Sequence, residues 1–120
     1  MKAVLLFAHG SRDPLWHRPI QAVAQRMAEL NPDVLTRCAY LELTEPTLAQ
    51  AAAELIESGA TQLTIVPMFL GVGKHAREDL PVLLADLRAQ HPEVRIECQP
   101  SVGEQAPVVE MLAQVALGLK

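Results

Sequence analysis

Three side chains that could bind a metal ion or move a proton follow three different apolar runs. His9 comes directly after the mostly apolar run 2–8, while Glu42 and His75 follow two later runs. Imidazole nitrogen binds borderline divalent cations such as Co²⁺, Ni²⁺, Fe²⁺ and Zn²⁺, and carboxylate oxygen tolerates them. An imidazole can also accept a proton near neutral pH. These residue types therefore predict a metal site, a proton-transfer site, or both.

A site built from two imidazoles and one carboxylate leaves coordination positions open. Structural zinc is usually enclosed by four protein ligands, so His9, His75 and Glu42 indicate a catalytic or transient site. The alternative is that one of the histidines caps a helix or a turn. Cys38 and Cys98 lie far apart with no Cys-x-x-Cys pair, which argues against both a structural zinc site and a disulfide. We expect two buried, reduced thiols.

The elements that must position these side chains follow from the hydrophobic pattern. Short apolar runs alternate with longer segments of helical period, which is typical of parallel βα units. No hairpin turn joins neighbouring runs, so crossover helices must connect the strands. The prediction is an α/β fold with a single open four-stranded parallel sheet flanked by helices, in one domain over residues 1–120. Strands are predicted at about 2–8, 34–41, 62–68 and 94–99, and helices at about 18–30, 47–59, 79–91 and 104–119.

Helix starts and apolar faces support these boundaries. Proline fits the first turn of a helix, so the first helix is expected to begin near Arg18 and Pro19. Asp79 is expected to cap the third helix, ahead of Pro81. Two helices have apolar positions at helical spacing: Leu48, Ala51, Ala52 and Leu55 in the second, and Val108, Met111, Leu112 and Val115 in the last.

The segment 70–75 places two glycines before the third helix, as phosphate-binding loops do. A P-loop requires Gly-x-x-x-x-Gly-Lys-Ser/Thr, however, and His75 stands where the hydroxyl should be. A flexible loop that lets the backbone approach a large planar ligand is the better interpretation. Such a loop would lie at the carboxyl ends of the strands, where open parallel sheets bind ligands. Lys74, Arg77 and Arg12 could bind carboxylates of that ligand, or they could simply be solvated.

Hydrolase chemistry is disfavoured by the neighbours of the candidate residues. In histidine phosphatases an arginine precedes the histidine, whereas Ala8 precedes His9 here. Ser11 lacks the Gly-x-Ser-x-Gly elbow of a serine nucleophile. The remaining candidates have weaker claims. His91 is expected to be a helix C-cap, and Trp16 is expected to pack over the first loop. His17 is close enough to that loop to support its ligating side chains without being a ligand itself.

Composition limits the classes of partner. The chain has 120 residues and a formal net charge of −4, so it lacks the basic character of most proteins that bind nucleic acid or anionic membranes. No apolar run approaches the roughly 20 residues of a membrane span, and the first eight residues are too short for a secretory signal. We expect a cytoplasmic protein with no nucleic-acid or membrane partner.

Three motifs together resemble the short sirohydrochlorin chelatases, which are class II chelatases of the cobalamin, sirohaem and nickel-tetrapyrrole pathways. The motifs are AHGSRDP at 8–14, YLELTEPT at 40–47 and VPMFLGVGKH at 66–75. The resemblance spans nearly the whole chain. It implies a chelatase-like fold that forms one lobe of a class II chelatase. Because longer relatives have two lobes around one cleft, it also implies a C₂ homodimer.

The resemblance implies insertion of a divalent metal into sirohydrochlorin with loss of two pyrrole protons. Co²⁺ is the expected metal substrate, with Fe²⁺ and Ni²⁺ as alternatives, and no cofactor is expected to be permanently bound. His9 and His75 match the family's metal-binding histidines, and His9 is also the expected proton acceptor. The other hypothesis is a carrier of metal or metallotetrapyrrole that does not catalyse insertion. The residues expected to contact the tetrapyrrole are Glu42 and Glu45, Ser11 and Arg12, and the loop of Leu70, Gly71, Val72, Gly73, Lys74 and His75.

Overall fold

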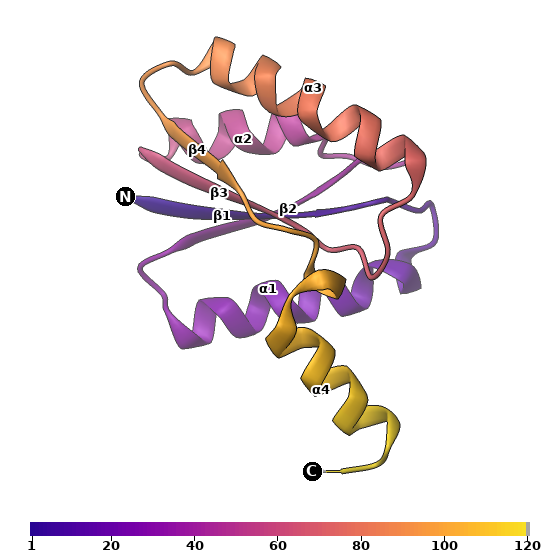
Figure 1. Cartoon of the computed structure of the whole chain (residues 1–120). Helices are drawn as coiled ribbons and strands as arrows, with labels where there is room; N and C mark the ends of the chain where they lie inside the picture. The colour runs from indigo at the N-terminus through magenta and orange to yellow at the C-terminus, as the bar shows by residue number, and fades with distance from the viewer. Residues whose placement is uncertain (120) are drawn as a thin grey trace.

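Four parallel strands form one open sheet in the order β2-β1-β3-β4, as the computed structural model shows for residues 1–119 (Figure 1). The strands are β1 (Lys2–Ala8), β2 (Leu35–Tyr40), β3 (Gln62–Pro67) and β4 (Arg95–Cys98). The central strand β1 pairs on both sides, and Phe7 lies opposite Ala39 in β2 and Pro67 in β3. The predicted α/β fold with a four-stranded parallel sheet is confirmed, and each strand ends within a residue or two of its predicted bounds.

Helices cover the two faces of the sheet unequally. The long helices are α1 (Arg18–Leu30), α2 (Leu48–Glu57), α3 (Lys74–Gln90) and α4 (Ala106–Ala116), with short 3₁₀ turns η1 (Pro14–His17) and η2 (Val102–Glu104). Helices α2 and α3 lie on one face, and α1 lies on the other (Figure 1). No helix among residues 1–119 is long and apolar enough to cross a membrane.

Each face of the sheet has its own apolar core, because successive side chains of a strand point to opposite faces. In β1, Leu5 and Phe7 pack into the core on the side of α2 and α3. Leu6 and Ala8 pack with Ile20 of α1 on the other side. The end of β1 is thereby fixed on both faces, and His9 follows it directly.

Helix α2 matches the prediction closely because local signals define it. Thr47 and Gln50 form a capping box, in which the Gln50 N–H donates to Thr47 Oγ1 at 3.2 Å and the Thr47 N–H donates to Gln50 Oε1 at 2.9 Å. The four residues predicted to face the core are the buried ones: Leu48, Ala51, Ala52 and Leu55.

The predicted start of the third helix is wrong. Helix α3 begins at Lys74, with Gly73 in the N-cap position, and Pro81 lies inside it. Proline removes a helical hydrogen-bond donor, but Pro81 is exposed, so water can reach the carbonyl group left without its partner. The consequence concerns the site, because His75 stands in the first turn of a helix and Asp79 in its second turn rather than at its cap.

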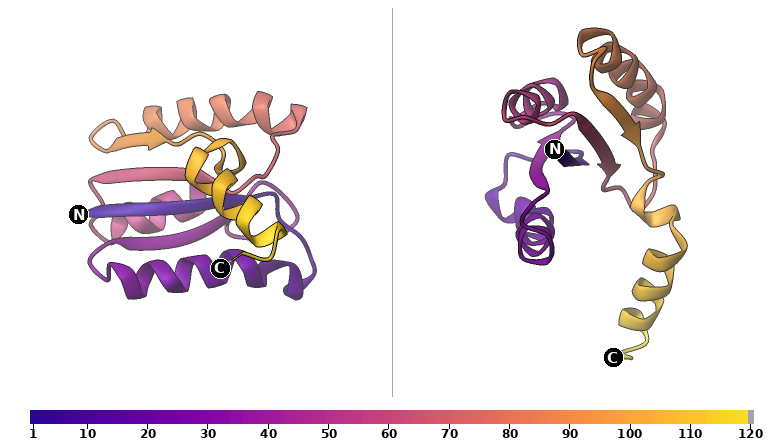
Figure 2. Two further views of the ribbon diagram at one scale, coloured as in Figure 1. Left: turned by 60° about the horizontal axis from the view of Figure 1, so that its bottom comes forward. Right: turned by 90° about the vertical axis from the view of Figure 1, so that its left-hand side faces the viewer.

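Helix α4 is shorter than predicted, and it does not pack against the sheet as the prediction of an apolar face implied. A separate turn, η2, precedes it, and the helix extends away from the rest of the chain (Figure 2). No residue of α4 is buried. In the predicted apolar stripe, Met111, Leu112 and Val115 are 58%, 44% and 65% exposed. The stripe therefore covers no core within residues 1–119.

The two cysteines are free thiols, as predicted, but each is only half-buried. Burial raises the pKa of both the Cys38 and the Cys98 thiol above its ordinary value. At neutral pH both side chains are accordingly held in the protonated, less nucleophilic form.

Candidate functional site

Three loops carry the predicted site residues, and all three leave the carboxyl edge of the sheet. They follow β1, β2 and β3, and they cover residues 9–13, 41–47 and 68–73. Because the strands are parallel, these loops begin side by side at one edge, which is where such sheets bind ligands.

The His9 imidazole packs against a buried aromatic ring, that of Phe69. The imidazole lies with its centroid 4.4 Å from that of the Phe69 ring, at an interplanar angle of 40°. Phe69 is 2% exposed, whereas the His9 side chain is open to solvent. Phe69 in turn contacts Phe7 edge to face, with centroids 6.0 Å apart. One face of the imidazole is therefore supported by the core while its nitrogens can reach a ligand.

Phe69 is a functional candidate that sequence reasoning missed. It stands two residues beyond β3, inside the segment 66–75 already singled out, and it is one of two phenylalanines in the chain. An apolar side chain beside a predicted site is normally taken for core. Only its stacking on His9 distinguishes it from other buried residues.

The loops after β1 and β2 are joined through their main chains. The Leu41 N–H donates to the Ala8 carbonyl at 2.9 Å, and the Glu42 N–H donates to the His9 carbonyl at 3.0 Å. Gly10 has a φ of 103° and packs so closely that a Cβ there would overlap the Glu42 carbonyl oxygen. Glu42 is thereby brought beside His9, and its exposed side chain faces solvent at the same edge.

His75 stands at the start of α3 and is almost fully exposed. Its side chain is 96% accessible, and its Nδ1 lies 3.9 Å from Oδ2 of Asp79, one helical turn later. A carboxylate next to the ring nitrogen of a histidine can orient the ring and leave the other nitrogen free for a metal. The position of Asp79 therefore suits a supporting role toward His75.

The loop before α3 is held from below by η2. The Gly103 N–H donates to the Phe69 carbonyl at 3.1 Å, and a Cβ on Gly103 would overlap the Leu70 carbonyl oxygen. Leu70 itself is 70% exposed. The exposed loop residues predicted to contact a substrate are Leu70, Gly71, Gly73 and Lys74, while Val72 packs partly against the core.

The other predicted substrate contacts are distributed along the edge. Ser11 Oγ accepts a hydrogen bond from the Asp13 N–H at 3.0 Å, and Arg12 is exposed beside it. Glu45 lines a shallow pocket with Arg37, Pro46, Gln50 and Glu54, along the free side of β2.

The edge does not form a ready-made metal cage. Within residues 1–119, no three His, Cys, Asp or Glu side chains come close enough together to hold a metal ion. His9 and His75 share the edge but belong to separate loops, and each offers a single imidazole. A metal ion held by either one would keep most of its coordination positions open.

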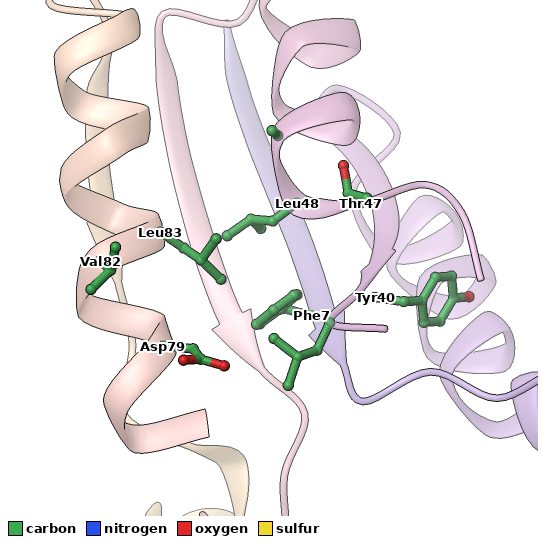
Figure 3. Close-up of a pocket in the computed structure, with 9 residues that line it drawn as sticks. Phe7, Tyr40, Thr47, Leu48, Asp79, Val82 and Leu83 are labelled. Carbon is green, nitrogen blue, oxygen red and sulfur yellow. The ribbon is translucent and has the colours of Figure 1, made fainter. Parts of the chain in front are cut away.

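A cavity of about 380 Å³ opens between α2 and α3 beneath this edge (Figure 3). Its walls are mainly apolar, and the Asp79 carboxylate stands at one side. None of the predicted ligands His9, Glu42 and His75 lines it. The lining residues are Phe7, Tyr40, Leu41, Thr47, Leu48, Ala49, Asp79, Val82 and Leu83.

The fold and the histidine-bearing edge define a chelatase-like α/β protein, and solved structures agree. A chain described as a CbiX protein of cobalamin (vitamin B12) biosynthesis from Marinobacter aquaeolei VT8 matches with a TM-score of 0.84 and 30% identity, covering 98% of this chain and 93% of that one. The sirohydrochlorin chelatase SirB from Bacillus subtilis subspecies spizizenii, in complex with cobalt, matches with a TM-score of 0.75 and 27% identity. This second match covers 98% of this chain and 51% of SirB.

The family model for CbiX matches residues 3–117, and the chain belongs to the CbiX family. Among curated relatives, the sirohydrochlorin cobaltochelatase of Methanocaldococcus jannaschii is 35% identical over 91 residues, which is 76% of this chain and 64% of that protein. The chain thus spans less than two thirds of that relative and about half of SirB.

Proposed function

We propose that this protein inserts a divalent metal into sirohydrochlorin with release of two pyrrole protons. The observation that carries the proposal is the placement of His9, exposed at the carboxyl edge of the sheet and seated on Phe69. Membership of the CbiX family and the activity named for the Methanocaldococcus relative support it. Co²⁺ is the favoured substrate ion, with Fe²⁺ and Ni²⁺ as alternatives, because imidazole ligands accept all three.

The proposed chemistry needs a transient ligand and a base. A neutral imidazole of His9 or His75 holds the incoming metal while coordination positions remain open for the pyrrole nitrogens. Two protons must leave as the metal enters, and His9 is the proposed acceptor, with Glu42 beside it. The absence of a closed metal cage within residues 1–119 suits this role, since a tightly held ion could not be transferred.

The proposed substrate contacts combine exposed loop residues with local cations. The loop from Leu70 to Gly73, which is exposed except at Val72, would lie against the macrocycle, as would Glu45 and Ser11. Arg12, Lys74 and Arg77 are exposed at the same edge and could pair with the carboxylates of the tetrapyrrole. Local cations are needed because the chain as a whole is acidic.

Activity is tested with metal-free sirohydrochlorin and Co²⁺ under anaerobic conditions, by following the absorption spectrum of the tetrapyrrole. We expect acceleration above the spontaneous rate and a large loss of rate in His9→Ala and His75→Ala. His91→Ala is the matched control, since His91 caps α3 at the opposite, amino edge of the sheet. Wild-type protein that does not accelerate insertion would contradict the proposal. A reaction that stops after one equivalent per site would identify a carrier instead.

We further propose that two copies of the chain assemble as a homodimer. SirB is about twice the length of this chain, so a second copy could occupy the place of its other half. The apolar side chains Met111, Leu112 and Val115 of helix α4 are exposed among residues 1–119. The helix itself extends away from the sheet (Figure 2). An apolar face of this kind is typical of an interface between subunits.

The dimer is tested by light scattering coupled to gel filtration. We expect the mass of a dimer for the wild type and of a monomer for Met111→Glu, because a buried, unpaired carboxylate disfavours the interface. Glu110→Gln is the control on the same helix, since Glu110 pairs with Gln114 on a polar side of α4. A monomeric wild type, or a Met111→Glu variant that stays dimeric, would overturn the proposed interface.

A further inference from the structure

His17 makes a short hydrogen bond to the loop that carries His9. As the last residue of η1, it places Nε2 2.7 Å from the carbonyl oxygen of Ser11. A carbonyl can only accept, so the His17 Nε2–H is the donor. The side chain is half-buried, which protects the bond from competition with water.

Aromatic packing fixes the ring that makes this bond. The His17 imidazole meets the Tyr40 ring edge to face at 4.8 Å and 90°, and it meets the Trp16 ring at 5.2 Å and 85°. Tyr40 is 5% exposed and ends β2, where it lies opposite Ala8 of β1. The donor is therefore anchored to the sheet rather than to another loop.

The loop itself has few other supports on this side. Asp13 donates its N–H to Ser11 Oγ and accepts the Leu15 N–H at Oδ1, and both bonds stay within the segment 11–15. They shape the loop without tying it to the sheet. On the other side, Glu42 holds the His9 carbonyl. The His17 bond thus completes a second attachment, two residues beyond His9.

We propose that His17 is a positioning residue for His9. It holds the Ser11 carbonyl, and so limits the conformations of the loop 9–13 and keeps the His9 imidazole over Phe69. The effect on catalysis rests on the proposed function, whereas the effect on the loop does not.

Two substitutions separate the hydrogen bond from the packing. His17→Phe keeps an aromatic ring against Tyr40 and removes the donor, while His17→Gln offers an amide donor without the ring. His91→Phe is the matched control at the far edge of the sheet. Amide hydrogen exchange measured on the free protein reports on the loop without any need for activity.

We expect the Asp13, Leu15 and Glu42 amides of His17→Phe to exchange about five-fold faster, as the loss of one such bond would allow. Amides of α2 should be unchanged. The kcat for cobalt insertion should fall about ten-fold with little change in KM, because misplacement acts on the reacting groups. His17→Gln should recover part of both effects.

The positioning role of His17 and the proposed metal insertion can fail separately. Unchanged exchange at those three amides in His17→Phe, or equal acceleration throughout the chain, would overturn the positioning role. If the loop loosens but kcat is unchanged in an active enzyme, His17 stabilises the loop without positioning His9, and the proposal is also overturned. If the wild type is inactive, the proposed function fails, while the exchange measurement still tests the attachment of the loop.

Discussion

The imidazole of His9 lies on the buried ring of Phe69, with the two centroids 4.4 Å apart. This contact connects the exposed edge to the core, since Phe69 also meets Phe7 from below. The orientation of a candidate ligand is therefore set by apolar packing.

Replacing Phe69 with leucine should reduce activity. The loss should be greater than that caused by the same substitution at an equally buried position away from His9. Leucine keeps the position apolar but removes the aromatic face. An aromatic pair of this kind changes an equilibrium constant by a factor of about two to ten beyond its buried area. We expect kcat for metal insertion to fall by that factor. Phe7→Leu is the control, because Phe7 is equally buried and its ring contact is with Phe69. Equal losses of kcat in the two variants would show that only packing is being measured.

Gly10→Ala should disturb the joint between the loops after β1 and β2. The substitution introduces both a strained φ and an overlap with the Glu42 carbonyl oxygen. Gly59→Ala is a matched control, since Gly59 has a similar φ of 109° and no atom within 4 Å of its added Cβ. We expect both variants to lose about 1–2 kcal/mol of unfolding free energy from strain, and Gly10→Ala to lose more because of the overlap. Only Gly10→Ala should also lose most of its activity.

Gly103→Ala should act on the loop that contains Leu70. The added methyl group would overlap the Leu70 carbonyl oxygen, so the contact between η2 and the loop must shift. Because this loop is proposed to lie against the tetrapyrrole, we expect KM for sirohydrochlorin to rise several-fold with a smaller change in kcat. Gly71→Ala adds a methyl group to open space in the same loop and is the comparison. A larger effect from Gly71 than from Gly103 would contradict the supporting role of η2.

Much of this architecture could be predicted because local signals agree with the final packing. Helix α2 has a capping box and a continuous apolar face, and both are visible in the sequence. The start of α3 could not be predicted because Asp79 and Pro81 are typical of a helix start, while the true N-cap, Gly73, contributes no side-chain hydrogen bond. Helix α3 therefore begins at Lys74, where its packing in the fold places it, and not at the local start signal of Asp79 and Pro81.

The candidate site could be predicted only as a set of residues on one edge. His9, Glu42 and His75 each follow a strand, and parallel pairing brings their loops to the same side. The contacts that orient them could not be predicted. Stacking of His9 on Phe69 and the bond from His17 to Ser11 depend on loop conformations that no periodic pattern encodes.

The two thiols should respond to alkaline pH in a defined direction. Burial raises the pKa of Cys38 and of Cys98, so the folded state holds these protons at pH values where the unfolded chain releases them. Stability is therefore unaffected below the ordinary thiol pKa and falls as the pH rises from that value towards the raised one. We expect unfolding midpoints in urea to decrease over this window. Replacing both cysteines with alanine should flatten the decrease, and an unchanged slope would contradict the assignment.

Asp79 should strengthen metal binding by His75 without being a ligand. Its carboxylate lies 3.9 Å from Nδ1 of His75, where it can favour the ring orientation that presents Nε2. Both side chains are well exposed, so the effect should lie at or below the lower end of the 10- to 100-fold range seen for buried partners of metal-bound histidines. We expect Asp79→Asn to weaken Co²⁺ binding about three- to ten-fold in calorimetric titration. Glu78→Gln removes the same charge from the neighbouring position and should have a smaller effect. Because the influence of Asp79 is exerted through His75, Asp79→Asn should change nothing further once His75→Ala is present. Additive losses in the double variant would show that Asp79 acts on the metal independently.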